Sequence, residues 1–291
     1  MASSNPKLPL VVIAGPTASG KTSLAIDLAK LYGGEIICAD SRSIYKGMDI
    51  GTAKPTKAEQ ATIPHWGLDL VNPGDSFSAA DFKKYAVEKI DEIRQRGNVP
   101  FLVGGTGLYI DAIIFDYKFG DQADYEQREM LNNMTLAELH DYCKNNNIAL
   151  PENKLNKRYV IRAIERNGAN NTKKERPIDN TIIVGITTDK SVLISRIEHR
   201  IEQLFEDGVV NEAKMLGKKY GWGSEAMKGN VYPLARLYLD GSITMSEMVL
   251  KLNTLDWQLA KRQLTWLRRN PFIKWGTIDE LRAYISNRLA K

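Results

Sequence analysis

The chain has 291 residues, of which 43% are hydrophobic and 26% charged, and its formal net charge is +5. These values predict a globular protein with one large domain or one domain with an insertion, and the modest positive charge permits nucleic-acid binding without requiring it. No run reaches the roughly 18–20 apolar residues of a membrane span, and the first eight residues carry no targeting pattern. The two cysteines, Cys38 and Cys143, lack the CxxC spacing of a zinc site. We therefore expect a cytoplasmic protein with no membrane partner.

Short apolar runs alternate with helical stretches along much of the chain. The run LPLVVIA at residues 8–14 is continuous, which is typical of a strand buried on both faces. Ser23–Tyr32 and Ala79–Gln95 have helical spacing, and further buried strands are predicted at 35–39, 99–103 and 181–186. This alternation indicates an α/β fold, in which helices cover both faces of a parallel sheet.

The apolar pattern changes after residue 116. Leu131, Met134, Leu139 and Tyr142 recur there at helical spacing, and no strand-like run occurs, so we expect a small helical insertion. The predicted organisation is a first part of the α/β core at 1–116, the insertion at 117–155, and a return to the core with C-terminal helices at 156–291.

A phosphate-binding loop is predicted at residues 15–22, which read GPTASGKT and match G-x-x-x-x-G-K-[ST] between a strand and a helix. Glycines let the backbone wrap closely, so that successive N–H groups and the helix N-terminus face an anion. Lys21 adds a charge to the phosphates, and the Thr22 hydroxyl is placed to bind a Mg²⁺ held by them. A di- or triphosphate site is therefore predicted at Gly15, Pro16, Thr17, Ala18, Ser19, Gly20, Lys21 and Thr22.

A carboxylate follows the second predicted strand. Among the apolar runs after the loop, only the one at 35–39 leads directly into an aspartate, Asp40. The carboxyl end of a parallel strand lies beside the phosphate loop, where α/β proteins bind ligands. Asp40 can hold a metal ion there, as in kinases, or act as a general base on an acceptor. A structural or capping role is the third alternative.

Several segments together resemble those of the bacterial tRNA dimethylallyltransferases, in the order of that family and over most of the chain. The most specific is ADSRSIYKGMDIGTAK at 39–54. The others are GPTASGKT at 15–22, Pro64-His65 with Leu68-Asp69, FSAADF at 77–82, GGTGLY at 104–109, RAIE at 162–165 and QLAKRQLTWL at 258–267.

The resemblance implies transfer of a dimethylallyl group from dimethylallyl diphosphate to the N6 amine of the adenosine 3′ of the anticodon, in tRNAs that read codons beginning with U. In that family the loop holds the diphosphate with Mg²⁺, and no NTP is hydrolysed. Lys21 and the metal then neutralise the leaving group, and Asp40 accepts a proton from the amine. The resemblance also gives Thr106 a role in positioning both substrates, and it places Lys214 near the diphosphate.

The same resemblance implies contacts with the anticodon stem-loop of tRNA. The segment Asp40–Ser43 matches the part of the family that contacts the target adenosine, and Arg128 matches an arginine at the start of the insertion. RNA loops are read by stacking and edge contacts, with basic residues on phosphates. The expected RNA-binding residues are Asp40, Ser41, Arg42, Ser43, Thr106, Arg128, Arg158, Tyr159, Arg162, Lys261 and Arg262. We expect the protein to act as a monomer.

Three features depart from the family pattern. The insertion is short, Val231 and Pro233 stand where the family has a glycine and a basic residue, and Lys214 replaces an arginine. The short insertion fits the first alternative, an enzyme that prenylates free adenine nucleotides. A small-molecule kinase that binds ATP at the loop, with Asp40 as its base, is the second alternative. A catalytically silent RNA-binding protein is the third, and it is disfavoured because every residue that the chemistry requires is present.

Overall fold

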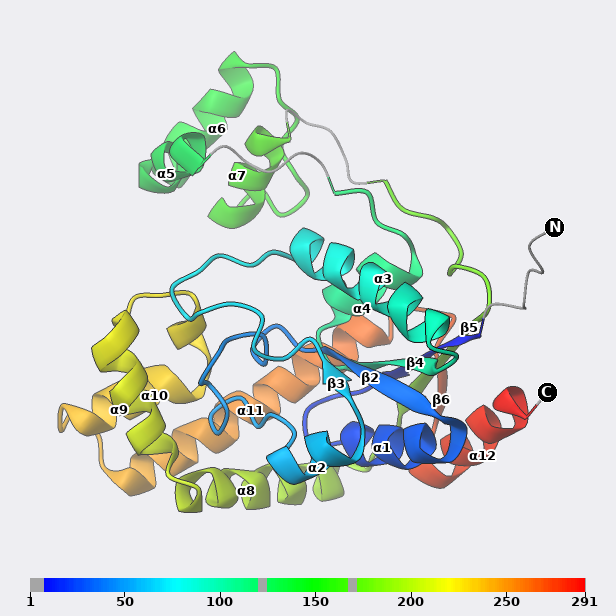
Figure 1. Cartoon of the computed structure of the whole chain (residues 1–291). Coiled ribbons are helices and arrows are strands. Elements are labelled where there is room, and N and C mark those ends of the chain that lie inside the picture. The colour runs from blue at the N-terminus through cyan, green and yellow to red at the C-terminus, as the bar shows by residue number, and fades with distance from the viewer. Residues whose placement is uncertain (1–7, 120–124, 167–171, 291) are drawn as a thin grey trace. The chain divides into compact units, whose positions relative to one another are not determined.

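The computed structural model describes residues 8–119, 125–166 and 172–290. The chain divides into two compact units, one formed by residues 1–115 with 176–291 and the other by 116–175; Figure 1 labels their helices and strands. The first seven residues, which bear on the expected lack of a targeting signal, lie outside the described ones. In the described part, no helix combines the length and apolar character needed to cross a bilayer.

A six-stranded sheet forms the centre of the larger unit, in the order β3-β2-β4-β1-β5-β6. Every pair of neighbouring strands is parallel, which confirms the predicted α/β fold. Four strands fall where continuous apolar runs predict them, whereas β3 and β6 are too short to give a sequence signal. The strands are β1 (Leu10–Ala14), β2 (Gly34–Ala39), β3 (His65–Trp66), β4 (Val99–Gly104), β5 (Thr181–Ile186) and β6 (Lys274–Gly276).

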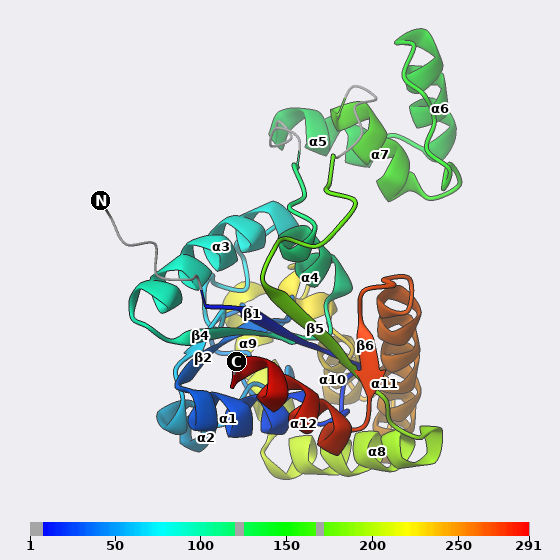
Figure 2. The ribbon, with the colours of Figure 1, turned by 90° about the vertical axis from the view of Figure 1, so that its right-hand side faces the viewer.

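Helices cover both faces of this sheet (Figure 2). Successive strand residues point to opposite faces, and Val11 and Ile13 share one buried cluster with residues of α1 (Lys21–Tyr32) and α12 (Ile278–Leu289). The other face carries α3 (Ala79–Gln95) and α4 (Gly107–Ile114). The sheet is therefore a rigid central layer, and the loops at its strand ends are anchored from both sides.

A second core in the same unit joins the helices after β5 to the segment that follows β2. It packs Ile44 and Met48, both fully buried, against residues of α8–α11. The last of these helices begins with a capping box in which Thr244 and Glu247 exchange hydrogen bonds with the backbone. The remaining elements of this unit are α2 (Lys57–Thr62), α8 (Lys190–Glu206), α9 (Val209–Tyr220), the 3₁₀ turn η1 (Ala226–Lys228), α10 (Val231–Leu239) and α11 (Met245–Leu267).

The smaller unit is helical, with its own core. It contains α5 (Tyr125–Asn133), α6 (Leu136–Asn145) and α7 (Lys157–Glu165). Its boundary differs from the predicted one: the unit extends to residue 175 rather than ending at 155. The reason is that α7 presents an apolar face to α5 and α6, so that it belongs to their core. The buried residues of this core are Leu131, Leu139, Cys143, Val160, Ile161 and Ile164.

Candidate active site

The phosphate loop connects the end of β1 to the start of α1, as predicted, and its backbone is tightly turned. Gly20 has a φ of 89°, which favours glycine, and a Cβ on Gly15 would lie 2.8 Å from Ser19 Oγ. The Nζ atom of Lys21 donates to the carbonyl oxygen of Pro16 at 2.8 Å. The hydroxyl of Ser19 is buried and has no hydrogen-bond partner among the described residues. Such an orphaned polar atom indicates a place for a ligand oxygen.

Lys21 lies in an environment that disfavours its charge. The pKa of Lys21 is lowered to about 8, mainly by burial; the nearby Asp40 carboxylate acts in the opposite direction, and the Arg200 guanidinium acts in the same direction as burial. An anion bound in the loop would supply the opposite charge that favours the ammonium form. The electrostatics of the loop therefore favour an anionic ligand.

The ends of β2 and β4 bring Asp40 and Thr106 together. The hydroxyl of Thr106 accepts a hydrogen bond from the Ser41 N–H at 3.1 Å, and the Thr106 N–H donates to the carbonyl of Ala39 at 3.2 Å. One carboxylate oxygen of Asp40, Oδ1, accepts from the Arg42 N–H at 2.7 Å. A backbone hydrogen bond thus orients the Asp40 carboxylate, and this carboxylate lies close enough to Lys21 to affect its pKa.

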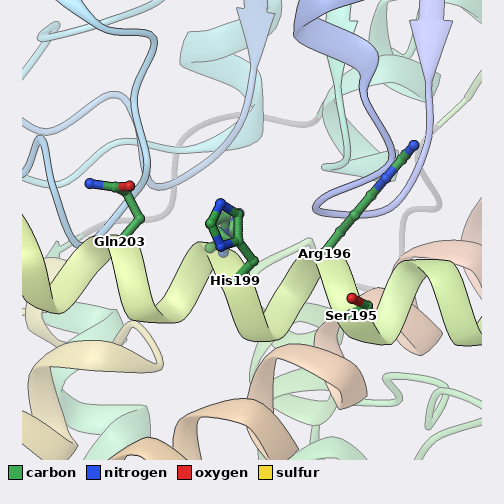
Figure 3. A pocket seen from close by; sticks show the side chains of 5 residues that line it. Ser195, Arg196, His199 and Gln203 are labelled. Atoms are coloured by element: carbon green, nitrogen blue, oxygen red, sulfur yellow. The ribbon is translucent and has the colours of Figure 1, made fainter.

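Two helices from the C-terminal half of the chain hold the loop from the other side. On α8, Arg200 donates from Nη1 to Thr17 Oγ1, and Arg196 donates to the carbonyl of Ser19 at 3.4 Å. On α11, the Gln263 Oε1 accepts from the Thr17 N–H at 2.8 Å. Figure 3 shows the α8 side chains, which line a hollow of about 460 Å³: Ser195, Arg196, His199, Arg200 and Gln203. No local sequence pattern predicts these contacts, because the residues lie 177 to 246 positions from their partners.

Comparisons with known proteins identify the family of this chain. A family model described as IPP transferase matches residues 43–270. The tRNA dimethylallyltransferase of Bacillus velezensis is 39% identical, over 93% of this chain and 91% of the relative, and that of Bacillus subtilis is 38% identical over the same shares. The full-length tRNA isopentenylpyrophosphate transferase of Bacillus halodurans has a TM-score of 0.75 at 38% identity, and the match covers 98% of this chain and 97% of that one. The chain belongs to the IPP transferase family.

A structure of a eukaryotic dimethylallyltransferase acting on tRNA is similar in fold alone. It superposes with a TM-score of 0.76 at 23% identity, over 89% of this chain and 70% of that one. The fold of this chain is thus found in a solved structure of low sequence identity.

The segment after Asp40 is held in this IPP transferase by a buried carboxylate on α9. Glu212 accepts hydrogen bonds from three consecutive backbone N–H groups, those of residues 49, 50 and 51, at 2.7–2.8 Å. It also accepts from the Tyr232 hydroxyl at 3.0 Å. The buried Nζ of Lys54 donates to the Tyr45 carbonyl and to two aspartates. This network fixes a segment that is otherwise free of regular structure over most of its length.

The structure shows the surroundings of the other predicted contact residues, whose contacts with substrate stay predictions. Ser43 is buried, with 5% of its surface exposed. The Arg42 guanidinium donates to the Glu225 carbonyl at 2.8 Å. Lys214 is exposed on α9 and stands two residues beyond the buried Glu212, hence about 200° around the helix from it. Its charge is directed away from the segment that Glu212 holds.

Lys261 and Arg262 are exposed on α11. The residue of this run that reaches the phosphate loop is Gln263, which accepts from the Thr17 N–H. Lys261 places its Nζ 5.8 Å from the centre of the Trp257 ring. RNA contact by the two basic residues stays a prediction.

The smaller unit gathers arginines around one carboxylate. Arg128 binds Glu165 through two nitrogens, with Nη2 to Oε2 at 2.6 Å. Burial lowers the pKa of Arg162 from its ordinary value, and Arg158, Arg166 and Arg128 lower it further. The Tyr159 side chain is 47% exposed. The predicted RNA-binding residues of α5 and α7 thus form a positively charged group, whose role stays a prediction.

The donor set fits a magnesium ion that is held mainly by its ligand. No cluster of three or more His, Cys, Asp or Glu side chains suited to a metal occurs in the described ranges. The orphaned Ser19 hydroxyl and the first turn of α1, where Thr22 lies, provide oxygen atoms next to the anion site. Mg²⁺ keeps several waters and binds through few protein oxygens plus phosphates. These residues therefore fit a metal ion that arrives with a diphosphate.

Proposed function

We propose that this protein transfers a dimethylallyl group from dimethylallyl diphosphate to N6 of the adenosine 3′ of the anticodon, in tRNAs that read codons beginning with U. Membership of the IPP transferase family and relatives that are named tRNA dimethylallyltransferases support this proposal. The observation that carries it is the position of Asp40 near Lys21 of the phosphate loop, with the Thr106 hydroxyl on the N–H of the next residue, Ser41.

The reaction requires a base and a site for a leaving anion in one place. A bond forms between the adenine N6 and C1 of the prenyl group, while the C1–O bond breaks and its electron pair leaves with the diphosphate. The proton of N6 passes to Asp40, whose Oδ1 already accepts from the Arg42 N–H. We assign the proton to the other oxygen, Oδ2.

The diphosphate is assigned to the loop from Gly15 to Thr22. Lys21 and Arg200 supply positive charge, and the Ser19 hydroxyl lacks a partner that a phosphate oxygen would provide. The family resemblance implies that Lys214 lies near the diphosphate. We assign this contact with the diphosphate to Arg200 instead, since Arg200 contacts the loop directly. A bound Mg²⁺, held by Thr22 and the diphosphate, would neutralise charge that develops on the leaving group.

We assign the holding of the tRNA to Arg158, Tyr159 and Arg162 of α7. Arginines contact phosphates, and an exposed aromatic ring stacks on an unpaired base. Arg128 is left out of this assignment, because its charge is already paired with that of Glu165.

The test is transfer of label from dimethylallyl diphosphate to unmodified tRNA in the presence of Mg²⁺. The matched control is Asp40→Asn, which keeps the size of the side chain and an acceptor for the Arg42 N–H but cannot accept the proton. We expect label on the adenosine beside the anticodon with the native protein and very little with the variant.

The remaining outcomes separate the alternatives. Label on free AMP or ADP but not on tRNA would identify a nucleotide prenyltransferase. Turnover of ATP without prenyl transfer would identify a kinase and contradict the proposal. Binding of tRNA with no chemistry on any acceptor would leave an RNA-binding protein.

A further inference from the structure

Asp256 is a buried carboxylate that the proposed reaction does not use. It lies in α11, and its side chain is 4% exposed. Its Oδ2 accepts from Arg200 Nη2 at 2.8 Å, and its Oδ1 accepts from Asn230 Nδ2 at 2.8 Å. A carboxylate next to an anion site opposes the anion by charge alone. Its position at this site therefore requires another reason.

The reason lies in the contacts of Arg200. One guanidinium nitrogen, Nη1, donates to Thr17 Oγ1 of the phosphate loop, and the other, Nη2, donates to Asp256. An arginine side chain loses rotational freedom when it binds an anion, and this loss weakens binding. A carboxylate that fixes the guanidinium beforehand removes part of that loss. The Nε atom of Arg200 is buried without a partner in the described part of the chain, so the guanidinium keeps capacity for another contact.

The loop itself is fixed from the same helix. Gln263, seven residues after Asp256, accepts from the Thr17 N–H at 2.8 Å. The backbone and the side chain of Thr17 are thus both held by α11, the first directly and the second through Arg200. The two contacts define one face of α11 as the support of the phosphate loop.

We propose that Asp256 is a positioning residue for diphosphate binding, which acts by holding Arg200 against Thr17. It does not touch the diphosphate, and removing it weakens binding only while Arg200 is present. The inference rests on the proposed function in one respect, namely that a diphosphate is the ligand of the loop.

A double-mutant cycle tests this dependence. The dissociation constant of inorganic diphosphate with Mg²⁺ is measured by calorimetry for the full chain and for Asp256→Ala, Arg200→Ala and the double variant. We expect Asp256→Ala to weaken binding roughly three- to tenfold, from the lost ordering of one long side chain. Arg200→Ala is expected to weaken it about 10- to 100-fold, from the lost charged hydrogen bond. The double variant should match Arg200→Ala within about twofold.

Two further variants separate positioning from a structural role. Asp256→Asn keeps an oxygen for Arg200 and can donate to Asn230 after the Asn230 amide turns, so binding should stay close to that of the native chain. Asn230→Ala breaks the link from Asp256 to the start of α10 but leaves the contact with Arg200, and we expect little change. Asp256→Ser, which is too short to reach Arg200, replaces the alanine variant if that one fails to fold.

Three results would overturn the inference. The first is that Asp256→Ala weakens diphosphate binding equally with and without Arg200. The second is that Asp256→Ala tightens binding because a negative charge is gone. The third is that Asn230→Ala weakens binding as much as Asp256→Ala does. The proposed function fails separately. Native protein that binds diphosphate but transfers no prenyl group to tRNA contradicts the function, whereas native transfer with an additive cycle contradicts only the role of Asp256. In the active enzyme, Asp256→Ala should raise the KM for dimethylallyl diphosphate and leave kcat nearly unchanged.

Discussion

The charged side chains that we assign to the diphosphate and to tRNA differ in how firmly they are held. In the larger unit, each charged side chain at the phosphate loop is held by at least one direct contact: Arg200 by Thr17 and Asp256, and Lys21 by Pro16. In the smaller unit, Arg158 is exposed on the surface of α7. The difference corresponds to two tasks, since groups that stabilise a reacting bond must be fixed in advance, while groups that bind a polyanion act mainly through charge.

This contrast gives each region a distinct response to substitution. Changes in the fixed region should alter chemistry or stability. Changes in the exposed region should alter the affinity for tRNA and its dependence on salt.

Asp40→Asn should produce the largest loss. The amide still accepts from the Arg42 N–H, so the segment stays in place, but it cannot take the proton of the acceptor. We expect kcat to fall by about 10²- to 10⁴-fold, the usual contribution of a general base, as measured by single-turnover transfer to tRNA. Thermal unfolding serves as the control and should show an unchanged midpoint. A kcat near that of the native protein would remove Asp40 from the mechanism.

Glu212→Ala should destabilise the fold. The carboxylate accepts three backbone N–H groups and the Tyr232 hydroxyl, and its loss leaves these donors without a partner. We expect the free energy of unfolding to fall by about 2–4 kcal/mol, as measured by urea denaturation. Glu212→Gln, which keeps one acceptor oxygen, should lie between. Equal stability of all three proteins would show that water replaces the carboxylate.

Arg158→Ala tests the exposed region. We expect the KM for tRNA to rise by several-fold and the slope of log K against log salt to decrease by about one, as for the loss of one phosphate contact. The KM for dimethylallyl diphosphate should not change. Arg158→Lys keeps the charge and should retain most of the affinity. An effect on the diphosphate instead of the tRNA would break the contrast between the two units.

Glu35 provides the smallest test, at the other end of the strand that leads to Asp40. Burial raises the pKa of Glu35, but hydrogen bonds from Arg96, Asn98 and Trp66 outweigh it, and the pKa falls below the ordinary 4.5. A carboxyl group whose pKa is lower in the folded than in the unfolded state stabilises the fold at pH values above its unfolded-state pKa. This stabilisation is lost as the pH falls through the folded-state pKa. Urea midpoints of native protein and Glu35→Gln should therefore converge on acidification. Curves that stay parallel would contradict the effect.

Local sequence rules were sufficient for structural features that are built from neighbouring residues. The phosphate loop is one contiguous stretch, and four strands carry continuous apolar runs, so both were predictable from local rules. Asp40 was predictable because a parallel strand delivers its last residue to the edge of the sheet where the loop lies. The boundary of the insertion at 155 was wrong, because an amphipathic helix does not reveal which core its apolar face joins.

Local sequence rules thus reach the fold class, the loop at 15–22 between a strand and a helix, and the position of Asp40 after β2. The packing of the helices adds which distant side chains contact that loop. Arg200, Asp256 and Gln263 look like ordinary helix residues, and Lys214 and Lys261 look equally suited to bind an anion. What separates them is which face of each helix packs on the loop, and packing follows from contacts between residues far apart in the chain. No local pattern of charge contains that information.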